Sequence, residues 1–301
     1  MLTRRSFVKT SALAASAAAL VPSVIEATSA YKPIVAVAKG EPADCVKRVI
    51  AALGGIKNFV KPGSRVVIKP NMGFPNPPEW STTTHPEVVK AVAELCIEAG
   101  ARRVIVIDHP LRDGEMCKER TGIGAALASL KGVVIAMPDD EKFFEEKTVP
   151  GAKELKTTLV AKEVLKADCL INIPTAKSHS ATGVSLGIKN LMGLVWDRKV
   201  FHERLELNRA VAEQLLVIKP NLTIVDAVYA LLTNGPGGPG NVTKIDTIVA
   251  SADPVAADSY SVGLARWYNR EFKGEQVKHI KIAAEMGFGE IDIAKMDIKT
   301  V

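Results

Sequence analysis

Residues 168–193, DCLINIPTAKSHSATGVSLGIKNLMG, carry more information about the fold and its chemistry than any other stretch of the chain. A short apolar strand is followed by a loop that holds Lys177, His179, Lys189 and Asn190 among small residues. All four side chains can donate hydrogen bonds, and the two lysines are positively charged near neutral pH. Such a cluster just beyond a strand is suited to holding an anionic ligand and moving a proton. We therefore predict a pocket for a small anion with His179, Lys177 and Lys189 as the catalytic residues, in which His179 transfers the proton and the lysines neutralise the anion.

Short β-branched runs alternate with helical patterns along the rest of the chain. The predicted strands cover residues 34–38, 65–69, 103–107, 133–136, 168–173, 222–225 and 247–250. Several of them are almost entirely apolar, which is typical of strands covered on both faces. We therefore predict an α/β fold, with a mainly parallel sheet layered between helices, as a single domain over residues 31–301. The charged segment 138–166 lacks clear strands and is expected to form a small insertion.

Three helices have recognisable signals. Residues 43–53 place their apolar side chains on one face. The sequence THPE at 84–87 fits a capping box, and Gly100 is expected to end the helix that follows. Asp253 before Pro254 is most simply a helix N-cap, and its helix is expected to run through Trp267.

Charge and cysteine content exclude several classes of protein. The net charge is +6, but the basic residues are spread along the chain without a concentrated run. We therefore predict no nucleic-acid partner, because binding the phosphate backbone needs a concentrated basic surface. The four cysteines lie far apart in sequence, so neither a CxxC pair nor an iron–sulfur ligand run is present, and no iron–sulfur cluster is expected. Three of them, Cys45, Cys96 and Cys169, fall on apolar positions and are expected to pack as small core residues.

The N-terminus has the features of an export signal. Residues 4–9, RRSFVK, precede an uncharged, alanine-rich stretch at 10–25 and small residues at 27–30. This pattern resembles the twin-arginine signal, so we predict a signal peptide over residues 1–30 and an exported, periplasmic or extracytoplasmic protein. The expected partners are the twin-arginine export machinery and, because that route carries folded cofactor proteins, a redox partner. Membrane contact is expected only through the signal segment, and an uncleaved anchor or a surface helix is the alternative.

Polar residues follow five of the predicted strands, at the end where open α/β sheets bind ligands. The predicted ligand-binding residues are Lys69, Asn71, His85, Asn190, Gly235 and Gly237. For His85, a role at the start of the following helix is as good an interpretation as ligand binding. The loop 234–240, NGPGGPG, can equally be a flexible turn, since its prolines remove N–H donors and it lacks a P-loop pattern.

Asp108 and Asp226 follow apolar strands and are the best carboxylate candidates. We predict that they hold a divalent metal or orient the lysines. Apolar residues surround Lys189, so it is expected to be buried and to need a partner, either the anionic ligand or Asp226. His202 is expected at the rim of the pocket, whereas His109 is expected to shape a turn. His279 and Trp267 are assigned to packing.

Six short motifs, taken in order, resemble the domain of unknown function 362 family. They are KPN (69–71), THP (84–86), KSH (177–179), LGIKNLMG (186–193), KPNLTIVD (219–226) and SADPVAAD (251–258). The resemblance covers nearly all of residues 34–290 and implies the architecture, but the family name implies no activity. Some relatives carry a fused ferredoxin-like module, and this chain has no such cysteine run.

A second resemblance leads to a competing hypothesis. The order of strand, K-x-H loop, glycine and lysine is similar to the lactate racemase group, which uses a nickel-bearing nucleotide cofactor. That resemblance implies that Lys177, Lys189 and His179 serve the cofactor and the proton transfer. Three functions therefore stay open: an enzyme acting on a small carboxylate or phosphate, a non-catalytic ligand-binding or redox-partner escort protein, and a racemase-like enzyme.

Overall fold

Consecutive residues of the central strands point to opposite faces of one sheet and supply two separate cores. In β2 (Arg65–Pro70), Val67 belongs to one core, whereas Val66 and Ile68 belong to the other. The same alternation holds in β3 (Arg103–Ile107). Because both faces of the sheet are apolar, each must be covered by other elements. The computed structural model that shows this arrangement describes residues 32–301, so the predicted signal peptide lies outside the described residues.

Within residues 32–301, ten strands form the main sheet, in the order β12-β1-β11-β10-β7-β2-β3-β4, with β8 beside β10 and β9 beside β8. The other strands are β1 (Ile34–Lys39), β4 (Val133–Ala136), β7 (Cys169–Ile173), β8 (Thr175–His179), β9 (Gly183–Ser185), β10 (Leu222–Leu231), β11 (Val242–Ser251) and β12 (Asp297–Thr300). The run from β10 through β7, β2 and β3 to β4 is parallel, and β11 is antiparallel to both of its neighbours. The prediction of a mainly parallel α/β sheet is confirmed.

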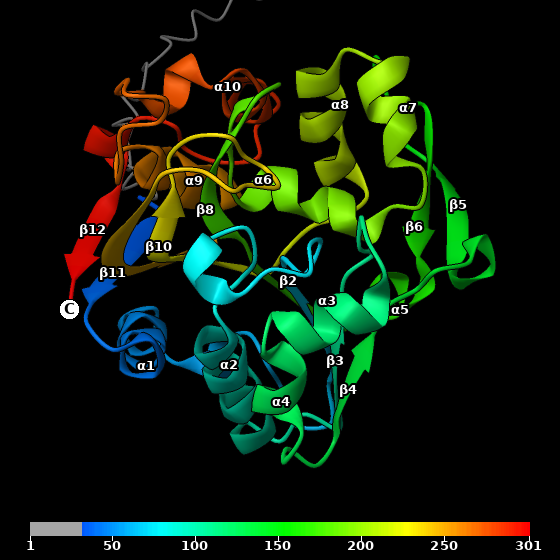
Figure 1. Ribbon diagram of the computed structural model, residues 1–301, viewed down its shortest axis with the longest axis vertical. Coiled ribbons are helices and arrows are strands. Elements are labelled where there is room, and N and C mark those ends of the chain that lie inside the picture. The colour runs from blue at the N-terminus through cyan, green and yellow to red at the C-terminus, as the bar shows by residue number, and fades with distance from the viewer. Residues whose placement is uncertain (1–31) are drawn as a thin grey trace, which may run out of the picture. The chain divides into compact units, whose positions relative to one another are not determined.

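Helices cover the two faces of the sheet (Figure 1). On one side lie α1 (Pro42–Ala52), α2 (Pro86–Glu98), α3 (Gly114–Arg120) and α4 (Ile123–Leu127). On the other side lie α6 (Gly187–Asn190), α8 (Leu207–Glu213), α9 (Pro254–Val262) and α10 (Lys278–Glu285). Two further helices, α5 (Lys162–Leu165) and α7 (Arg198–Glu203), and several 3₁₀ turns are also present. No helix within residues 32–301 has both the length and the apolar character needed to cross a membrane.

The segment 138–166 contains more regular structure than its charged sequence suggests. It forms an antiparallel pair of strands, β5 (Phe144–Thr148) and β6 (Thr157–Ala161), so the predicted small insertion is present, but it is not poor in strands. The connection between the two strands is held by the buried carboxylate of Glu213. That carboxylate accepts hydrogen bonds from the backbone N–H groups of Lys153, Glu154 and Leu155 at 2.7–2.9 Å.

Two of the predicted helix boundaries are wrong. Asp253 caps α9 as predicted, but the helix ends at Val262 instead of continuing to Trp267. The buried indole of Trp267 folds back and donates a hydrogen bond of 2.8 Å to the Val262 carbonyl, an otherwise unpaired group at the helix end. At α2 the N-cap is His85, not Thr84 as a capping box requires.

Thr84 connects two strand ends instead of capping α2. Its hydroxyl accepts a hydrogen bond of 2.7 Å from the Asn71 N–H and donates one of 2.7 Å to the Ile173 carbonyl. These residues follow or end β2 and β7, which are neighbours in the sheet. The motif at 84–86 therefore fixes the loops at the carboxyl end of the sheet.

The four cysteines are buried and form no disulfide within the described residues. Cys45, Cys96 and Cys169 lie in the core beneath α1 and α2, as predicted. Burial raises the pKa of the Cys169 thiol to about 12, so this side chain remains an uncharged core residue near neutral pH.

The start of α6 is held by Asp258, a residue of α9 that is fully buried. Its carboxylate accepts hydrogen bonds from the N–H groups of Gly187 at 2.6 Å and Ile188 at 2.8 Å. There is no room for a side chain at Gly187, because a Cβ atom there would lie 2.7 Å from the Asp258 carboxylate and 2.8 Å from the Thr223 methyl group. α6 thus approaches α9 and β10 more closely than any residue except glycine permits.

We expect Gly187→Ala to destabilise the fold by about 2 kcal/mol, because overpacking a rigid site costs about 1–3 kcal/mol. Gly263→Ala is the matched control, since its added Cβ has no neighbour closer than 3.5 Å and its φ of −75° suits alanine. Urea denaturation measures the free energy of unfolding of both variants. Equal stability of the two variants would contradict the close approach of α6 described above.

Candidate functional site

Side chains from several distant segments line one cavity of about 360 Å³. The cavity lies beyond the carboxyl ends of β2 and β3 and beside β8, where open α/β sheets bind ligands. Seven of the residues predicted for the site line it, namely Lys69, Asn71, Asp108, Lys177, His179, Lys189 and Asn190. His202 also lines it, as expected for a residue at the rim. Four predicted residues, His85, Asp226, Gly235 and Gly237, do not.

Lys69 and Asp108 form a buried ion pair at one wall of the cavity, with Nζ 3.1 Å from Oδ1. The other carboxylate oxygen of Asp108 accepts a hydrogen bond of 2.6 Å from the Met72 N–H. Burial lowers the pKa of Lys69, and the Asp108 charge opposes that shift. Gly193 makes room for the pair, because a Cβ atom there would lie 2.1 Å from Asp108 Oδ1 and 2.8 Å from Lys69 Nζ.

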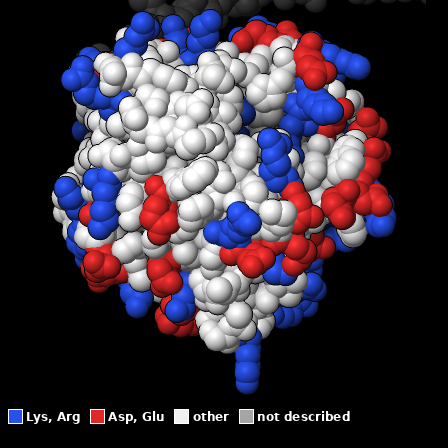
Figure 2. Space-filling model, in the orientation of Figure 1, with Lys and Arg blue, Asp and Glu red and all other residues white. Residues whose placement is uncertain are grey.

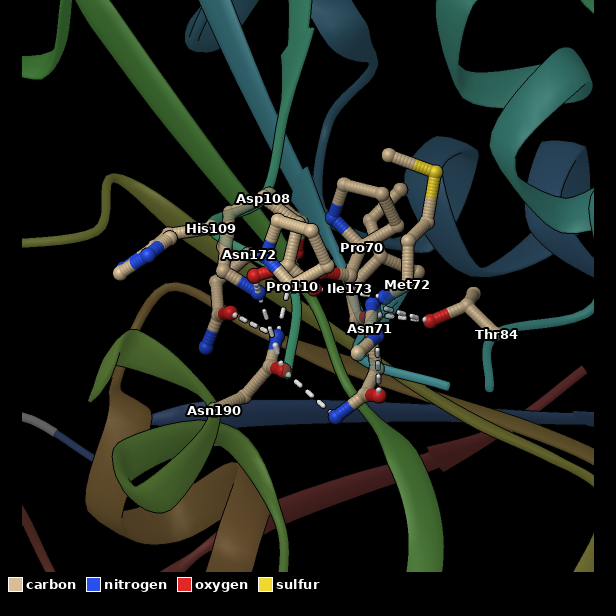
Figure 3. Close-up of polar contacts among 12 residues, drawn as sticks. Pro70, Asn71, Met72, Thr84, Asp108, His109, Pro110, Asn172, Ile173 and Asn190 are labelled. Carbon is tan, nitrogen blue, oxygen red and sulfur yellow. Dashed lines mark hydrogen bonds and ion pairs between the residues drawn. The ribbon is translucent and has the colours of Figure 1, made fainter. Parts of the chain in front are cut away.

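The amide of Asn190 connects three elements beneath the cavity (Figure 3). Its NH₂ group donates to Asn172 Oδ1 at 2.8 Å and to the Lys69 carbonyl at 3.2 Å. Its oxygen accepts from Asn71 Nδ2 at 3.1 Å and from Lys69 Nζ at 3.2 Å. Asn190 is thus fully engaged within the protein, and it positions Lys69 and Asn71 relative to α6.

Lys177 and His179 lie on a strand, β8, and not in a loop as predicted. The two side chains are two residues apart, so they share the face of β8 that lines the cavity. Ala176 lies in the core instead, and the Ser178 hydroxyl accepts a hydrogen bond from Gly235. The sequence TAKSH lacks the β-branched and aromatic residues that mark strands, and pairing with β9 and β10 supplies the missing stabilisation.

The ammonium groups of Lys177 and Lys189 are buried without a carboxylate partner among residues 32–301. Lys177 donates a hydrogen bond of 2.6 Å to the Thr82 carbonyl and lies 5.2 Å from the centre of the Phe74 ring. Burial lowers the pKa of Lys177 to about 7, with the Asp108 charge opposing the shift. Burial and the charge of Arg198 lower the pKa of Lys189 to about 7 as well. The burial predicted for Lys189 is confirmed.

His179 is held as a neutral imidazole by its surroundings. Burial is the main cause that lowers its pKa to about 2, and the charges of Lys189 and Lys177 add to the effect. Its Nδ1 accepts a hydrogen bond of 3.2 Å from the Ala181 N–H, so the neutral ring carries its proton on Nε2. The ring stacks on His202, with centroids 6.2 Å apart and planes inclined by 12°.

Arg198 is a cavity residue that the sequence analysis did not identify. It is the first residue of α7, directly after the Asp197 N-cap, and it donates hydrogen bonds to the carbonyls of His109 and Pro110 at 2.6 and 2.9 Å. It thereby holds the loop after β3 against α7 and adds a positive charge to the cavity wall. The signal in the sequence is its place in the run of three charged residues, Asp197 to Lys199, that follows LGIKNLMG.

Asp226 and His85 belong to a neighbouring structural network. β10 continues through Asp226 to Leu231, so Asp226 lies within the strand and does not follow it. Its carboxylate accepts hydrogen bonds from the N–H groups of His85 at 2.7 Å and Val228 at 3.0 Å. Asp226 is therefore not the partner of Lys189, and it shares no site with Asp108. Within residues 32–301, no three His, Cys, Asp or Glu side chains are grouped so that they can hold a metal ion.

The glycines of the loop between β10 and β11 are required for packing. A Cβ atom at Gly235 would lie 1.9 Å from the Ser178 carbonyl oxygen, and one at Gly237 would lie 3.1 Å from the Phe74 ring. Of this loop, Pro236 lines the cavity. The two glycines hold the loop against β8 and Phe74 and do not contact the cavity themselves.

Comparisons with known proteins identify relatives of the chain. A family model described as "Domain of unknown function (DUF362)" matches residues 66–263. The thylakoid-associated protein sll1697 of Synechocystis sp. is 30% identical over 220 residues, which are 71% of this chain and 66% of that protein. The chain thus spans just under two thirds of this relative's length.

The fold of this chain is weakly similar to two solved structures. The lactate racemase apoprotein from Thermoanaerobacterium thermosaccharolyticum has a TM-score of 0.44 and 13% identity, covering 73% of this chain and 54% of that one. A protein of Thermotoga maritima has the same score and identity, covering 82% and 60%. These values carry no conclusion about activity. The family match includes the KSH and LGIKNLMG motifs and all of the cavity residues, and the chain therefore belongs to the DUF362 family.

Proposed function

We propose that the protein is an enzyme that binds a small carboxylate- or phosphate-bearing ligand in this cavity and transfers a proton to or from it. The observation that carries the proposal is the charge imbalance of the cavity wall. Five basic side chains line it, Lys69, Lys177, Lys189, Arg198 and Lys199, against two acidic ones, Asp108 and Glu203. Asp108 is already paired with Lys69. An oxyanion ligand supplies the negative partner that the remaining cations lack in the empty cavity.

The two unpaired lysines suit the proton transfer. A general acid or base works best when its pKa lies near the working pH, and burial brings both lysines to about 7. One of them in its neutral form accepts a proton, and the other in its charged form binds the anion. His179, which stays neutral in the empty cavity, then serves as a hydrogen-bond donor through Nε2.

A non-catalytic ligand-binding or escort protein is the second candidate, because binding an anion requires the same charges but no turnover. Exchange of a carbon-bound proton of a bound carboxylate with deuterium from the solvent, followed by NMR, separates the two. The enzyme catalyses this exchange and Lys177→Met abolishes it, whereas an escort protein binds the acid without exchange.

The racemase-like alternative adds inversion of configuration to the exchange. We assign no step to a nickel-nucleotide cofactor.

Removing either unpaired lysine should weaken anion binding. We expect Lys177→Met and Lys189→Met each to lower the affinity for inorganic phosphate or acetate at pH 6.5 by about tenfold or more, since a charge-assisted contact contributes about 1.5–3 kcal/mol. Lys142→Met is the matched control, because Lys142 is exposed, pairs with Asp140 and lies outside the cavity. Calorimetric or NMR titration measures the affinities. An equal loss in all three variants would argue against a specific site.

Anion binding should weaken as the pH rises from about 6 to 9. The empty cavity holds lysines with pKa values of about 7, and a bound anion raises them, so binding takes up protons above neutral pH. Calorimetry in buffers of different ionisation enthalpy measures this uptake. The stability of the ligand-free protein changes with pH in the opposite direction to the anion affinity. Because the folded protein binds fewer protons than the unfolded chain, its free energy of unfolding increases as the pH rises from about 7 towards 10.5. Binding that is independent of pH would contradict the role of these lysines.

We also propose that the protein acts outside the cytoplasm after export by the twin-arginine route. The proposal rests on the RRSFVK sequence at residues 4–9 and the alanine-rich stretch that follows. We expect the double variant Arg4→Lys/Arg5→Lys to leave the protein in the cytoplasmic fraction, whereas the parent chain reaches the extracytoplasmic fraction. Lys32→Gln, a change of a basic residue beyond the predicted signal, serves as the control. Export of the double variant at the parent level would refute this assignment.

A further inference from the structure

We propose that the ligand of this cavity is amphiphilic, with an acidic group at the lysines and an uncharged hydrocarbon or aromatic part at the mouth. The proposal deepens the anion-binding function proposed above and rests on it. It names the ligand class as a small acid with an apolar substituent.

The two kinds of side chain lie at different depths in the cavity. The side chains of Lys69, Lys177 and Lys189 are buried. Leu111 also lines the cavity, yet 48% of its surface is exposed, and Phe74 and Pro236 are partly exposed. An acid that enters therefore reaches the cations with its charged group and leaves its remaining part beside apolar side chains.

The apolar side chains at the mouth are held in place by the backbone. The Leu111 N–H donates a hydrogen bond of 3.0 Å to the Gly73 carbonyl, which fixes Leu111 next to the segment of Phe74. The Phe74 ring packs against Gly237 and lies 5.2 Å from Lys177 Nζ. Phe74 thus marks the boundary between the charged part of the cavity and its apolar part.

On the side formed by residues 71–84 and 230–243, the surface that continues from the mouth carries almost no charge, whereas the exposed Lys199 and Glu203 line the cavity from α7. Residues 230–243 contain no charged side chain, and residues 71–84 contain only Glu79. A hydrogen bond of 3.2 Å from Asn76 Nδ2 to the Gly237 carbonyl joins the two segments. Figure 2 shows the resulting uncharged area in the region where Figure 1 places the loop after β10. A second anionic group finds no cation on these two segments, so the part of the ligand that lies against them and Leu111 is expected to be uncharged.

The size of the cavity limits the ligand further. Its volume of about 360 Å³ lies at the lower end of the range for small-molecule sites, which is about 300–1,000 Å³. The exposed Leu111 side chain gains burial when an apolar substituent covers it, and such burial favours binding. The cavity therefore fits a single short-chain or single-ring acid.

A homologous series of ligands tests the inference. Straight-chain carboxylates from acetate to octanoate, titrated at pH 6.5 and followed by NMR, keep the charged group constant while the tail grows. We expect the affinity to rise about threefold to fourfold for each added methylene, the factor that corresponds to burying one CH₂ group, until the chain leaves the cavity. The matching alkyl phosphates show whether a carboxylate or a phosphate is the preferred acid.

One variant at the mouth and one control complete the test. Leu111→Ser is expected to reduce the ratio of octanoate affinity to acetate affinity by about tenfold. Phe143→Ser leaves that ratio unchanged, because Phe143 is similarly exposed, at 45%, but lies outside the cavity.

The outcomes separate this inference from the function on which it rests. If acetate and octanoate bind equally well, and Lys177→Met weakens both, the ligand is not amphiphilic although the anion site is real. If the affinity rises with chain length but Lys177→Met leaves the affinity of every member unchanged, the inference is also overturned, because the acid is then not held at this lysine. If no member of either series binds, the proposed function itself fails.

Discussion

The burial of several positive charges beside one another is the constraint on which the rest of this structure depends. An ammonium group loses its hydration when it is buried, and neighbouring cations raise that cost. The ion pair with Asp108 offsets part of this cost for Lys69, whereas Lys177 and Lys189 have no carboxylate partner among residues 32–301. Nothing in the packing of an α/β sheet requires such a group of cations. These cations lie at the carboxyl end of the sheet, where open α/β sheets bind ligands.

Maintaining this group requires rigid support, and the sequence motifs supply it. Gly187 lets α6 approach α9, where the Asp258 carboxylate accepts two backbone hydrogen bonds at 2.6 and 2.8 Å. Asn190 connects α6 to β2 and β7, and Gly193 leaves room for the Lys69–Asp108 pair. The LGIKNLMG motif therefore contains one cation of the site, Lys189, and several residues that fix the positions of the others. This division of roles explains why small and polar residues stand inside an otherwise apolar segment.

The sequence predicted the layered fold, and seven of the eleven residues proposed for the site line the cavity, because those features depend on local patterns. Apolar strand runs and the polar residues directly after them are visible without the structure. The remaining parts depend on contacts between distant residues. β8 has weak strand propensity and exists because β9 and β10 pair with it, and Asp226 is removed from the site because β10 continues beyond it. Asp258, 71 residues from Gly187, supports the site through hydrogen bonds that no spacing rule indicates.

The lowered pKa values of Lys177 and Lys189 couple anion binding to proton transfer in the proposed function. In the empty cavity the cost of burial is reduced when a lysine releases its proton, so near neutral pH Lys177 and Lys189 are each divided between charged and neutral forms. An incoming oxyanion favours the charged form of the lysine that it touches, and that charge in turn favours the neutral form of the other lysine. In the proposed function, one ligand therefore gives two chemically equal side chains different roles, one as the binding cation and one as the base. Burial and the charges of Lys189 and Lys177 hold the pKa of His179 far below its usual range in the empty cavity, so the proposed function gives the proton transfer to the lysines and a hydrogen-bonding role to His179.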